Sequence, residues 1–168
     1  DLSQVVTGSV DIYYGNIKEG IAVNIDGSAD TGTISKGSMG TDTISSISSA
    51  LSSLIGGFGL SGTALADTFQ LNVDTGQWMY VRGGDGADSY EINGAGKVRL
   101  DLRDGNQGVN IDLANRTIFD DGFGNQEFIS GSNTVWEVRT TDFNDNIIGS
   151  DANESFILRG GNDTLDGG

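Results

Sequence analysis

Three residue types are missing from this chain: cysteine, proline and histidine. Without cysteine, the chain has no disulfide and no thiolate metal ligand. Without histidine, it has no imidazole ligand, and neither a Ser-His-Asp nor a Cys-His catalytic arrangement can form. These absences exclude most familiar classes of hydrolase and of zinc protein.

Basic residues are scarce, with nine Lys and Arg against 24 Asp and Glu, and the net charge is −15. This surplus of negative charge disfavours nucleic acid and anionic membrane surfaces as partners. Two carboxylates about 5 Å apart repel by roughly 3 kcal/mol at an effective dielectric near 20, so metal cations are the expected counterpart. No long apolar run and no signal-peptide pattern occurs, and the first residue is not Met. We therefore expect a soluble fragment or processed piece with no membrane insertion.

Glycine, by contrast, is abundant, at 27 of 168 residues. The sequence also repeats over a long interval, because "VNID" at 23–26 recurs at 109–112. Further along, "GTALADTFQL" (62–71) aligns with "GSDANESFIL" (149–158), and each copy leads into a glycine-rich segment. We therefore expect two related units, 1–92 and 93–168, within one continuous fold.

A shorter period of nine residues occurs inside the second unit. From residue 131 the nonapeptides are "GSNTVWEVR", "TTDFNDNII", "GSDANESFI" and "LRGGNDTLD". Their sixth places hold Trp136, Asp145, Glu154 and Asp163, and their eighth places hold Val138, Ile147, Phe156 and Leu165. In the first unit "GGDGADSYE" (83–91) has the whole pattern, with Asp88 sixth and Tyr90 eighth. An acid followed two residues later by an apolar residue predicts that the carboxylate lies where the turn meets the strand, and that the apolar side chain points into the core.

One turn and one short strand per nonapeptide give a coil of two nonapeptides, so residues 18 apart lie one above the other. Asp145 and Asp163 have this spacing. Stacked turns bring carboxylates and backbone carbonyls together, and Ca²⁺ takes about six to eight such oxygens. The spacing therefore predicts a calcium site shared between coils.

Apart from the nonapeptides, the sequence predicts mainly strands. Alternating apolar residues flanked by Gly, Asn and Asp indicate strands at 9–14, 20–26, 97–103, 108–113 and 133–139, with an inserted strand within 72–81. One helix candidate is Thr43 to Ile55, where apolar residues recur on one helical face and several serines weaken the pattern. The expected fold class is all-β, with room for one short helix.

The nonapeptides resemble those of the repeats-in-toxin (RTX) family, the haemolysin-type calcium-binding repeat proteins. Residues 83–91 match the pattern Gly-Gly-x-Gly-x-Asp-x-apolar-x at every defined position, and 140–168 match it in phase with fewer glycines. Residues 108–168 also resemble the segment that precedes such repeats in large secreted proteins, and 21–47 with 62–91 resemble a more divergent copy. Residues 1–20 show no such resemblance.

The resemblance implies a parallel β-roll or β-solenoid, calcium-dependent folding and one-step (type I) secretion from a Gram-negative-type cell. Carried over by position, it implies side-chain calcium ligands at Asp88, Asp145 and Asp163, with Glu154 as a longer substitute and the carbonyls of Gly83, Asp85 and Gly160 as supplements. Trp136 departs from the pattern at a ligand position. Val98 and Ser61 stand at the expected acid positions on either side of Asp88, so the pattern predicts that Asp88 lacks a stacked partner.

Other acids and aromatics have simpler interpretations. Asp and Asn also populate turns because of their local hydrogen bonds, and Asp26 and Asp112 fit plain strand-end acids. Asp120, Asp121 and Glu127 fit a solvated acidic loop better than a carboxylate cluster. Aromatic side chains can stack on sugar rings, but burial in strands is commoner. The aromatic residues concerned are Trp78, Tyr80 and Trp136.

The leading hypothesis is a non-catalytic, calcium-stabilised structural module of a secreted, extracellular or cell-surface adhesin-like protein. A second hypothesis is a polysaccharide-active enzyme or carbohydrate-binding accessory module on a parallel β-helix, with acid-base work by Asp112, Glu127 or Tyr80. A third is a solenoid face that binds a partner or another copy of the chain. The partners under these hypotheses are calcium ions, cell-surface polysaccharide and other copies of the chain, and no nucleic acid.

Overall fold

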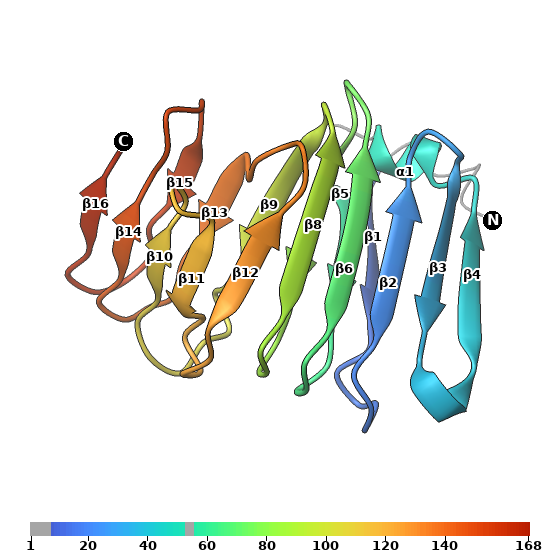
Figure 1. Cartoon of the computed structure of the whole chain (residues 1–168), viewed down its shortest axis with the longest axis horizontal. Coiled ribbons are helices and arrows are strands. Elements are labelled where there is room, and N and C mark those ends of the chain that lie inside the picture. The colour runs from blue at the N-terminus through green and yellow to red at the C-terminus, as the bar shows by residue number, and fades with distance from the viewer. Residues whose placement is uncertain (1–7, 53–55) are drawn as a thin grey trace.

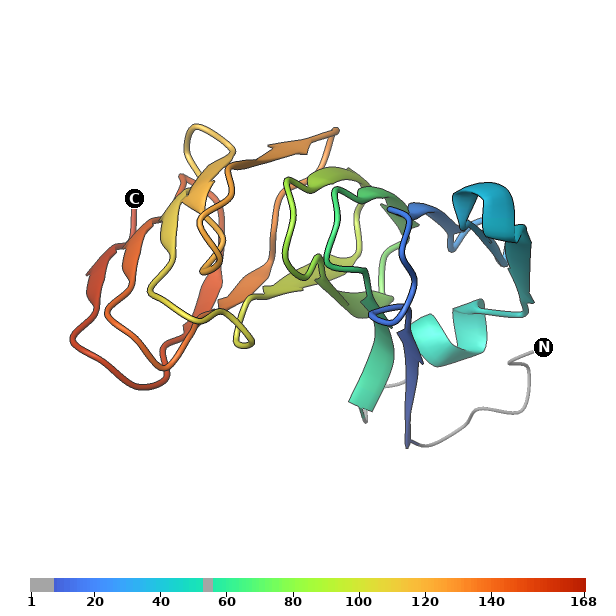
Figure 2. The same cartoon turned by 90° about the horizontal axis from the view of Figure 1, so that it is seen from below.

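The computed structural model describes residues 8–52 and 56–168. This part of the chain is almost entirely strand and turn, with sixteen strands, one single-turn α-helix and one 3₁₀ turn, η1 (Gly37–Met39). The expected all-β class is therefore confirmed. The strands form two sheets, which lie as two layers facing each other (Figures 1 and 2).

The first sheet, called sheet A here, has six strands, and all of its neighbouring pairs are parallel. In spatial order they are β1 (Gly8–Tyr13), β5 (Gly56–Ser61), β7 (Trp78–Arg82), β9 (Lys97–Asp101), β13 (Glu137–Arg139) and β15 (Ser155–Ile157). All five strands expected from the sequence and the inserted strand occur, because β1, β2, β7, β9, β10 and β13 overlap the predicted ranges.

The second sheet, sheet B, has ten strands and faces the viewer in Figure 1. In spatial order they are β16 (Thr164–Asp166), β14 (Asn146–Ile148), β10 (Asn110–Asp112), β11 (Thr117–Asp120), β12 (Glu127–Ser130), β8 (Ser89–Gly94), β6 (Thr68–Val73), β2 (Ala22–Asp26), β3 (Thr31–Ser35) and β4 (Thr41–Ser45). Two parallel groups, β2-β6-β8-β12 and β10-β14-β16, are joined through the antiparallel strand β11.

The chain passes back and forth between the sheets, so that one coil consists of a strand in each sheet and two turns. In the second unit Asn146 pairs with Thr164, a register step of two nonapeptides, which confirms the predicted stacking distance. In the first unit Thr68 pairs with Ser89, and this step is longer than two nonapeptides. The first unit therefore has a longer coil than the nonapeptide count predicts.

The long repeat corresponds to two antiparallel hairpins within sheet B. Each "VNID" segment lies in a strand that turns back into an antiparallel neighbour, β2 into β3 and β10 into β11. Both units contribute strands to the same two sheets and side chains to one core cluster. They are thus joined in one continuous fold.

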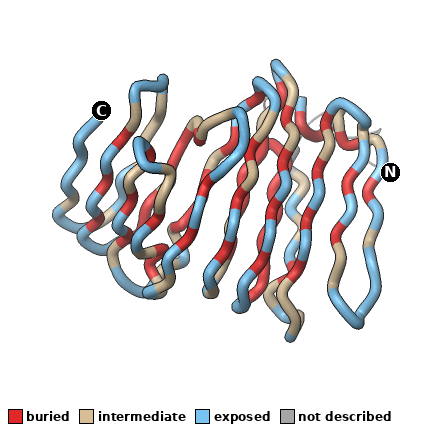
Figure 3. The backbone as a smooth tube through the Cα atoms, viewed as in Figure 1, coloured by how far each residue is buried: buried red, intermediate tan, exposed pale blue. Residues whose placement is uncertain are grey.

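The core lies between the sheets, and buried and exposed residues alternate along most strands (Figure 3). Phe69 and Tyr90 stack there with ring centroids 5.3 Å apart. Of the eighth-place residues, Val138 and Ile147 are buried and Phe156 packs partly against the core. The inward prediction is wrong for Leu165, which is 43% exposed, because its strand β16 lies at the edge of sheet B.

The predicted helix at 43–55 is mostly wrong. Strand β4 continues to Ser45, and the helix α1 covers only Ser48–Leu51, while residues 53–55 lie outside the described residues. The apolar periodicity arose because Ile44 and Leu51 are both buried, one from a strand and the other from a helical turn. Within the described residues, no helix has the length and apolar character needed to span a bilayer.

Two glycines at the fourth place of a nonapeptide make close stacking of the turns possible. Gly86 has φ +116 and Gly161 has φ +107. A Cβ at Gly86 would lie 2.5 Å from the backbone carbonyl carbon of Leu65, and one at Gly161 would lie 2.5 Å from that of Phe143. Each glycine therefore removes a steric conflict with the preceding coil as well as allowing a backbone conformation that other residues avoid.

We predict that Gly86→Ala destabilises the protein by more than the roughly 1–3 kcal/mol that a strained φ costs, because the new methyl group also meets the coil below. Gly40→Ala is the matched control, since Gly40 has φ +96 and a Cβ at this position would meet no atom within 4 Å. The measurement is urea unfolding of both variants in calcium-containing buffer. Equal losses in the two variants would contradict a packing role for Gly86.

Candidate metal centre

A column of acidic residues crosses sheet B at the N-terminal ends of its parallel strands. Asp67, Asp88, Asp145 and Asp163 each directly precede a strand, namely β6, β8, β14 and β16, and Glu127 is the first residue of β12. The register places Ser89 opposite both Thr68 and Phe128. Asp67, Asp88 and Glu127 are therefore neighbours in the column, as are Asp145 and Asp163.

Several of these carboxylates accept hydrogen bonds from the turn that directly precedes them in the chain. The Thr63 amide donates to Asp67 Oδ2 at 2.6 Å, and the Thr141 hydroxyl donates to Asp145 Oδ1 at 2.7 Å. In both turns a threonine stands four residues before the acid, so the carboxylate reaches back across the turn. Such hydrogen bonds to a charged acceptor are stronger than neutral ones.

The same carboxylates also connect one coil to the previous one. The Asp67 amide donates to Asp88 Oδ1 at 2.8 Å, and the Asp145 amide donates to Asp163 Oδ1 at 3.1 Å. The Val109 amide donates likewise to Asp145 Oδ1 at 2.9 Å. Asp145 and Asp163 are thus stacked as predicted, and each acid receives a backbone hydrogen bond from the coil before it.

The prediction that Asp88 lacks a stacked partner is wrong. The segment that lies below 83–91 is 62–70, which has Asp67 in the sixth place, and not 56–64 with Ser61. The error came from comparing Asp88 with the glycine-containing segment 56–64, whereas the acid in the coil below lies 21 residues before Asp88. On the other side of Asp88 lies Glu127, from a segment that follows β9, β10 and β11 in the chain.

The remaining expected ligands are spread over the turns. Glu154 lies before the sheet A strand β15, and its carboxylate accepts from the Ser150 amide at 2.8 Å. Gly83 leaves the space that Asp88 Oδ2 occupies, since a Cβ at Gly83 would overlap that oxygen. Asp85 is exposed and accepts from Asn125 Nδ2 at 2.9 Å. Gly160 lies against the backbone of Asp142 in the preceding coil.

Asp26 and Asp112 have the local role expected of strand-end acids. Asp26 Oδ1 accepts from the amides of Ser28 and Ala29, at 3.0 and 3.1 Å. Asp112 Oδ1 accepts from the Asn115 amide at 2.9 Å. The Ser28 hydroxyl also donates to Asp26 and the Asn115 side-chain amide to Asp112, and these side-chain bonds, followed by the backbone bonds, lower the pKa of each carboxyl.

Three acids are buried together beside the column. Asp88, Asp121 and Glu127 are 2%, 1% and 0% exposed, so the prediction of a solvated loop is wrong for Asp121 and Glu127. Asp121 Oδ1 is used by its own loop, because it accepts from the amides of Phe123 at 2.8 Å and Asn125 at 3.0 Å. Asp88 and Glu127 are less well satisfied.

Asp88 Oδ2 and Glu127 Oε2 are buried and have no hydrogen-bond partner among the described residues. The Tyr90 hydroxyl donates to the other oxygen of Glu127 at 3.3 Å. Burial, with added repulsion from Asp88 and Asp121, raises the pKa of Glu127 to about 10. Burial likewise raises the pKa of Asp88 to about 8. An unpaired buried carboxylate is costly, so the pair requires either a proton or a cation.

In the described part of the chain, no group of three or more acidic side chains already converges as a metal-binding set. Of these three acids, Asp121 has its oxygens engaged by its own loop, and Asp88 and Glu127 each have one buried oxygen without a hydrogen-bond partner among the described residues. A calcium ion at this pair would complete its shell with backbone carbonyls and water. The arrangement is therefore chemically suited to binding a proton or a cation.

The sequence reasoning missed Asp67 and Glu127 as members of the column. A signal for Asp67 was present, because "GTALADTFQ" (62–70) and "GGDGADSYE" (83–91) share Gly, Ala-Asp and an aromatic residue in phase. For Glu127 no repeat signal exists, since an antiparallel excursion separates it from Asp88. Only the fold brings it to this position.

We predict that, in calcium-free buffer, stability falls as pH rises from about 4 to about 10. A carboxyl with a raised folded pKa stabilises the fold fully below its unfolded pKa near 4, and this contribution is lost up to the folded pKa. Each such proton lowers the free energy of unfolding by about 1.4 kcal/mol per pH unit within this range. Glu127→Gln, whose amide can donate to Asp88, is expected to flatten the pH dependence of the folded fraction, measured as β signal in circular dichroism from pH 5 to 9. An unchanged slope in the variant would show that this pair does not titrate as described.

Comparison of the chain with protein-family models, with curated proteins and with solved structures finds no match. The resemblance to the RTX family thus depends on the nonapeptide pattern alone. The functional conclusion depends on the acid column and on the buried pair of Asp88 and Glu127.

Proposed function

We propose that this chain is a calcium-binding, calcium-stabilised structural module built as a β-roll-like solenoid. The observation that carries the proposal is the buried pair of carboxylate oxygens, Asp88 Oδ2 and Glu127 Oε2, which have no partner among the described residues. A hard divalent cation satisfies both oxygens and removes their repulsion. Among the cations that prefer oxygen ligands alone, calcium also tolerates irregular coordination from turn carbonyls.

The principal site in this proposal consists of Asp88 and Glu127. Asp121 lies close enough to raise the pKa of both carboxyls, so it adds negative potential that attracts the ion. A second site is proposed at Asp145 and Asp163, which stack one coil apart at the same edge of sheet B. This second pair has weaker support, because Asp145 already accepts hydrogen bonds from Thr141 and Val109.

Calcium binding and folding are coupled in this proposal. The net charge of −15 and the 27 glycines both oppose a compact state, through repulsion and backbone entropy. A ligand that binds only the folded chain shifts the equilibrium toward it. Such a module suits calcium-rich surroundings outside the cell, so we place it in a secreted or cell-surface, adhesin-like protein. The absence of cysteine means that calcium replaces disulfides as the stabilising cross-link.

We predict that the chain is largely disordered in a calcium chelator and gains β signal in circular dichroism on calcium addition. Asp88→Asn and Glu127→Gln are each expected to weaken the calcium response by at least tenfold, because a buried ligand is lost. Asp112→Asn is the matched control, since it removes the same charge from an exposed turn. A fully folded spectrum in chelator, unaltered by calcium, would refute coupled folding.

We also predict that calcium binding releases protons. With the pKa of Glu127 near 10 and that of Asp88 near 8 in the folded chain, the pair holds protons that the ion displaces, so the measurement is made near pH 5, where the protonated pair favours the folded calcium-free chain. Titration calorimetry in two buffers of different ionisation enthalpy measures the number released, and Glu127→Gln is expected to lower it by about one. Buffer-independent heats would place the ion elsewhere.

A further inference from the structure

An open groove on the outer face of sheet A contains both tryptophans of the chain. Trp78 comes from β7 and Trp136 from the turn before β13, and Lys97 of β9 lies with them in the lining. The groove has a volume of about 500 Å³, within the range of about 300–1,000 Å³ of small-ligand sites. Both indoles are half-buried, so the prediction of buried strand aromatics is wrong for them, while Tyr80 is buried.

The two indoles lie beside cationic groups. The Lys97 ammonium is 4.2 Å from the ring centroid of Trp136, and the Arg99 guanidinium is 5.4 Å from that of Trp78. Gly57 of the neighbouring strand leaves room for the Trp78 ring, which a side chain there would overlap. Aromatic faces and a cation thus share one groove.

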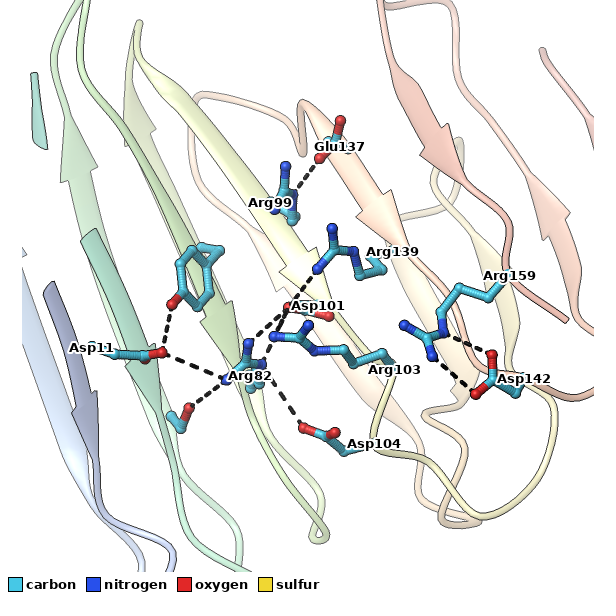
Figure 4. Close-up of polar contacts among 12 residues, drawn as sticks. Asp11, Arg82, Arg99, Asp101, Arg103, Asp104, Glu137, Arg139, Asp142 and Arg159 are labelled. Carbon is cyan, nitrogen blue, oxygen red and sulfur yellow. Dashed lines mark hydrogen bonds and ion pairs between the residues drawn. The ribbon is translucent and has the colours of Figure 1, made fainter. Parts of the chain in front are cut away.

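Positive charge is concentrated on this side of the molecule. Of the nine basic residues in the chain, five lie on β7, β9, β13 or directly after β9: Arg82, Lys97, Arg99, Arg103 and Arg139. Figure 4 shows Arg82, Arg103 and Arg139 around the single carboxylate of Asp101, and Arg99 beside Glu137. Arg82 also lies near Asp11 and Asp104, so each of these four arginines forms at least one ion pair with a carboxylate.

Lys97 differs from these arginines. Its side chain is exposed, and within the described residues it forms no ion pair with a carboxylate. Lys18 and Arg116 likewise form no ion pair with a carboxylate among the described residues, but of these three cations Lys97 is the one that lines the groove. Its long stem lets the ammonium move from the Trp136 ring to a bound anion.

We propose that this groove binds an acidic saccharide, a sugar ring that carries a carboxylate. The apolar face of a pyranose packs against an indole, and Lys97 donates a charge-assisted hydrogen bond to the carboxylate of the sugar. A uronate polymer has one charge per ring, which the acidic protein tolerates better than the denser charge of nucleic acid. The saccharide site lies on sheet A and uses none of the residues of the buried carboxylate pair.

The test uses a galacturonate trimer and the intrinsic tryptophan fluorescence of the full chain in calcium. Because the chain has two tryptophans and both line the groove, any direct quenching reports on this site. We expect a saturable change, and Lys97→Gln is expected to weaken binding by roughly tenfold or more. Lys36→Gln is the matched control, because Lys36 already pairs with Asp42 at 2.6 Å and lies outside the groove. It is expected to leave the affinity unchanged.

Several outcomes would overturn the proposal. These are no saturable change at millimolar trimer, equal affinity in Lys97→Gln with an unchanged circular dichroism spectrum, and equal binding of the neutral galactose trimer. Tighter binding of a single-stranded oligonucleotide of the same charge would assign the groove to nucleic acid instead. Repeating the titration in chelator, with circular dichroism as the folding check, separates the result from the outcome of the calcium proposal.

Discussion

The burial of two carboxylates against each other is the constraint on which the centre of this structure depends. Asp88 and Glu127 come from segments that the sheet B register brings side by side, and their unpartnered oxygens lie inside the protein. The pairing of β8 with β12 therefore also brings these two charges together. A bound proton or cation resolves this conflict, so the state of the pair determines how stable the stacked coils are.

The turn geometry shows why the nonapeptide contains the residues it does. Glycine in the first place leaves the space into which the sixth-place carboxylate folds back, as Gly83 does for Asp88. Glycine in the fourth place, as at Gly86, lets the backbone approach the coil below. Where the second place is threonine, as at Thr63, its hydroxyl donates to the acid at 3.0 Å. The 62–70 turn uses both, because Gly62 also leaves the space that Asp67 Oδ2 occupies.

The sequence predicted local structure well and long-range neighbours only where the period was constant. Strand positions and the stacking of Asp145 on Asp163 followed from the alternation and from the nonapeptide spacing. The position of Asp67 was missed because its coil is longer than two nonapeptides, and that of Glu127 because a hairpin intervenes. The exposure of Leu165 was missed because a core residue and an edge residue have the same local pattern. The pairing of distant strands within a sheet depends on loop lengths and on intervening hairpins, which a single sequence period does not predict.

The two sheets differ in the groups that contact their buried carboxylates. Backbone amides and Tyr90 hold the carboxylates at the edge of sheet B, whereas the arginines on the outer face of sheet A hold Asp101. Burial raises the pKa of Asp101, and attraction to Arg82 and Arg139 counteracts this, so that carboxyl needs no external cation. Glu127 has no such basic neighbour among the causes that shift its pKa. Arginines therefore compensate the buried carboxylate on sheet A, whereas no basic group is among the causes that shift the pKa of Asp88 or Glu127 beside sheet B, although both sheets enclose the same core.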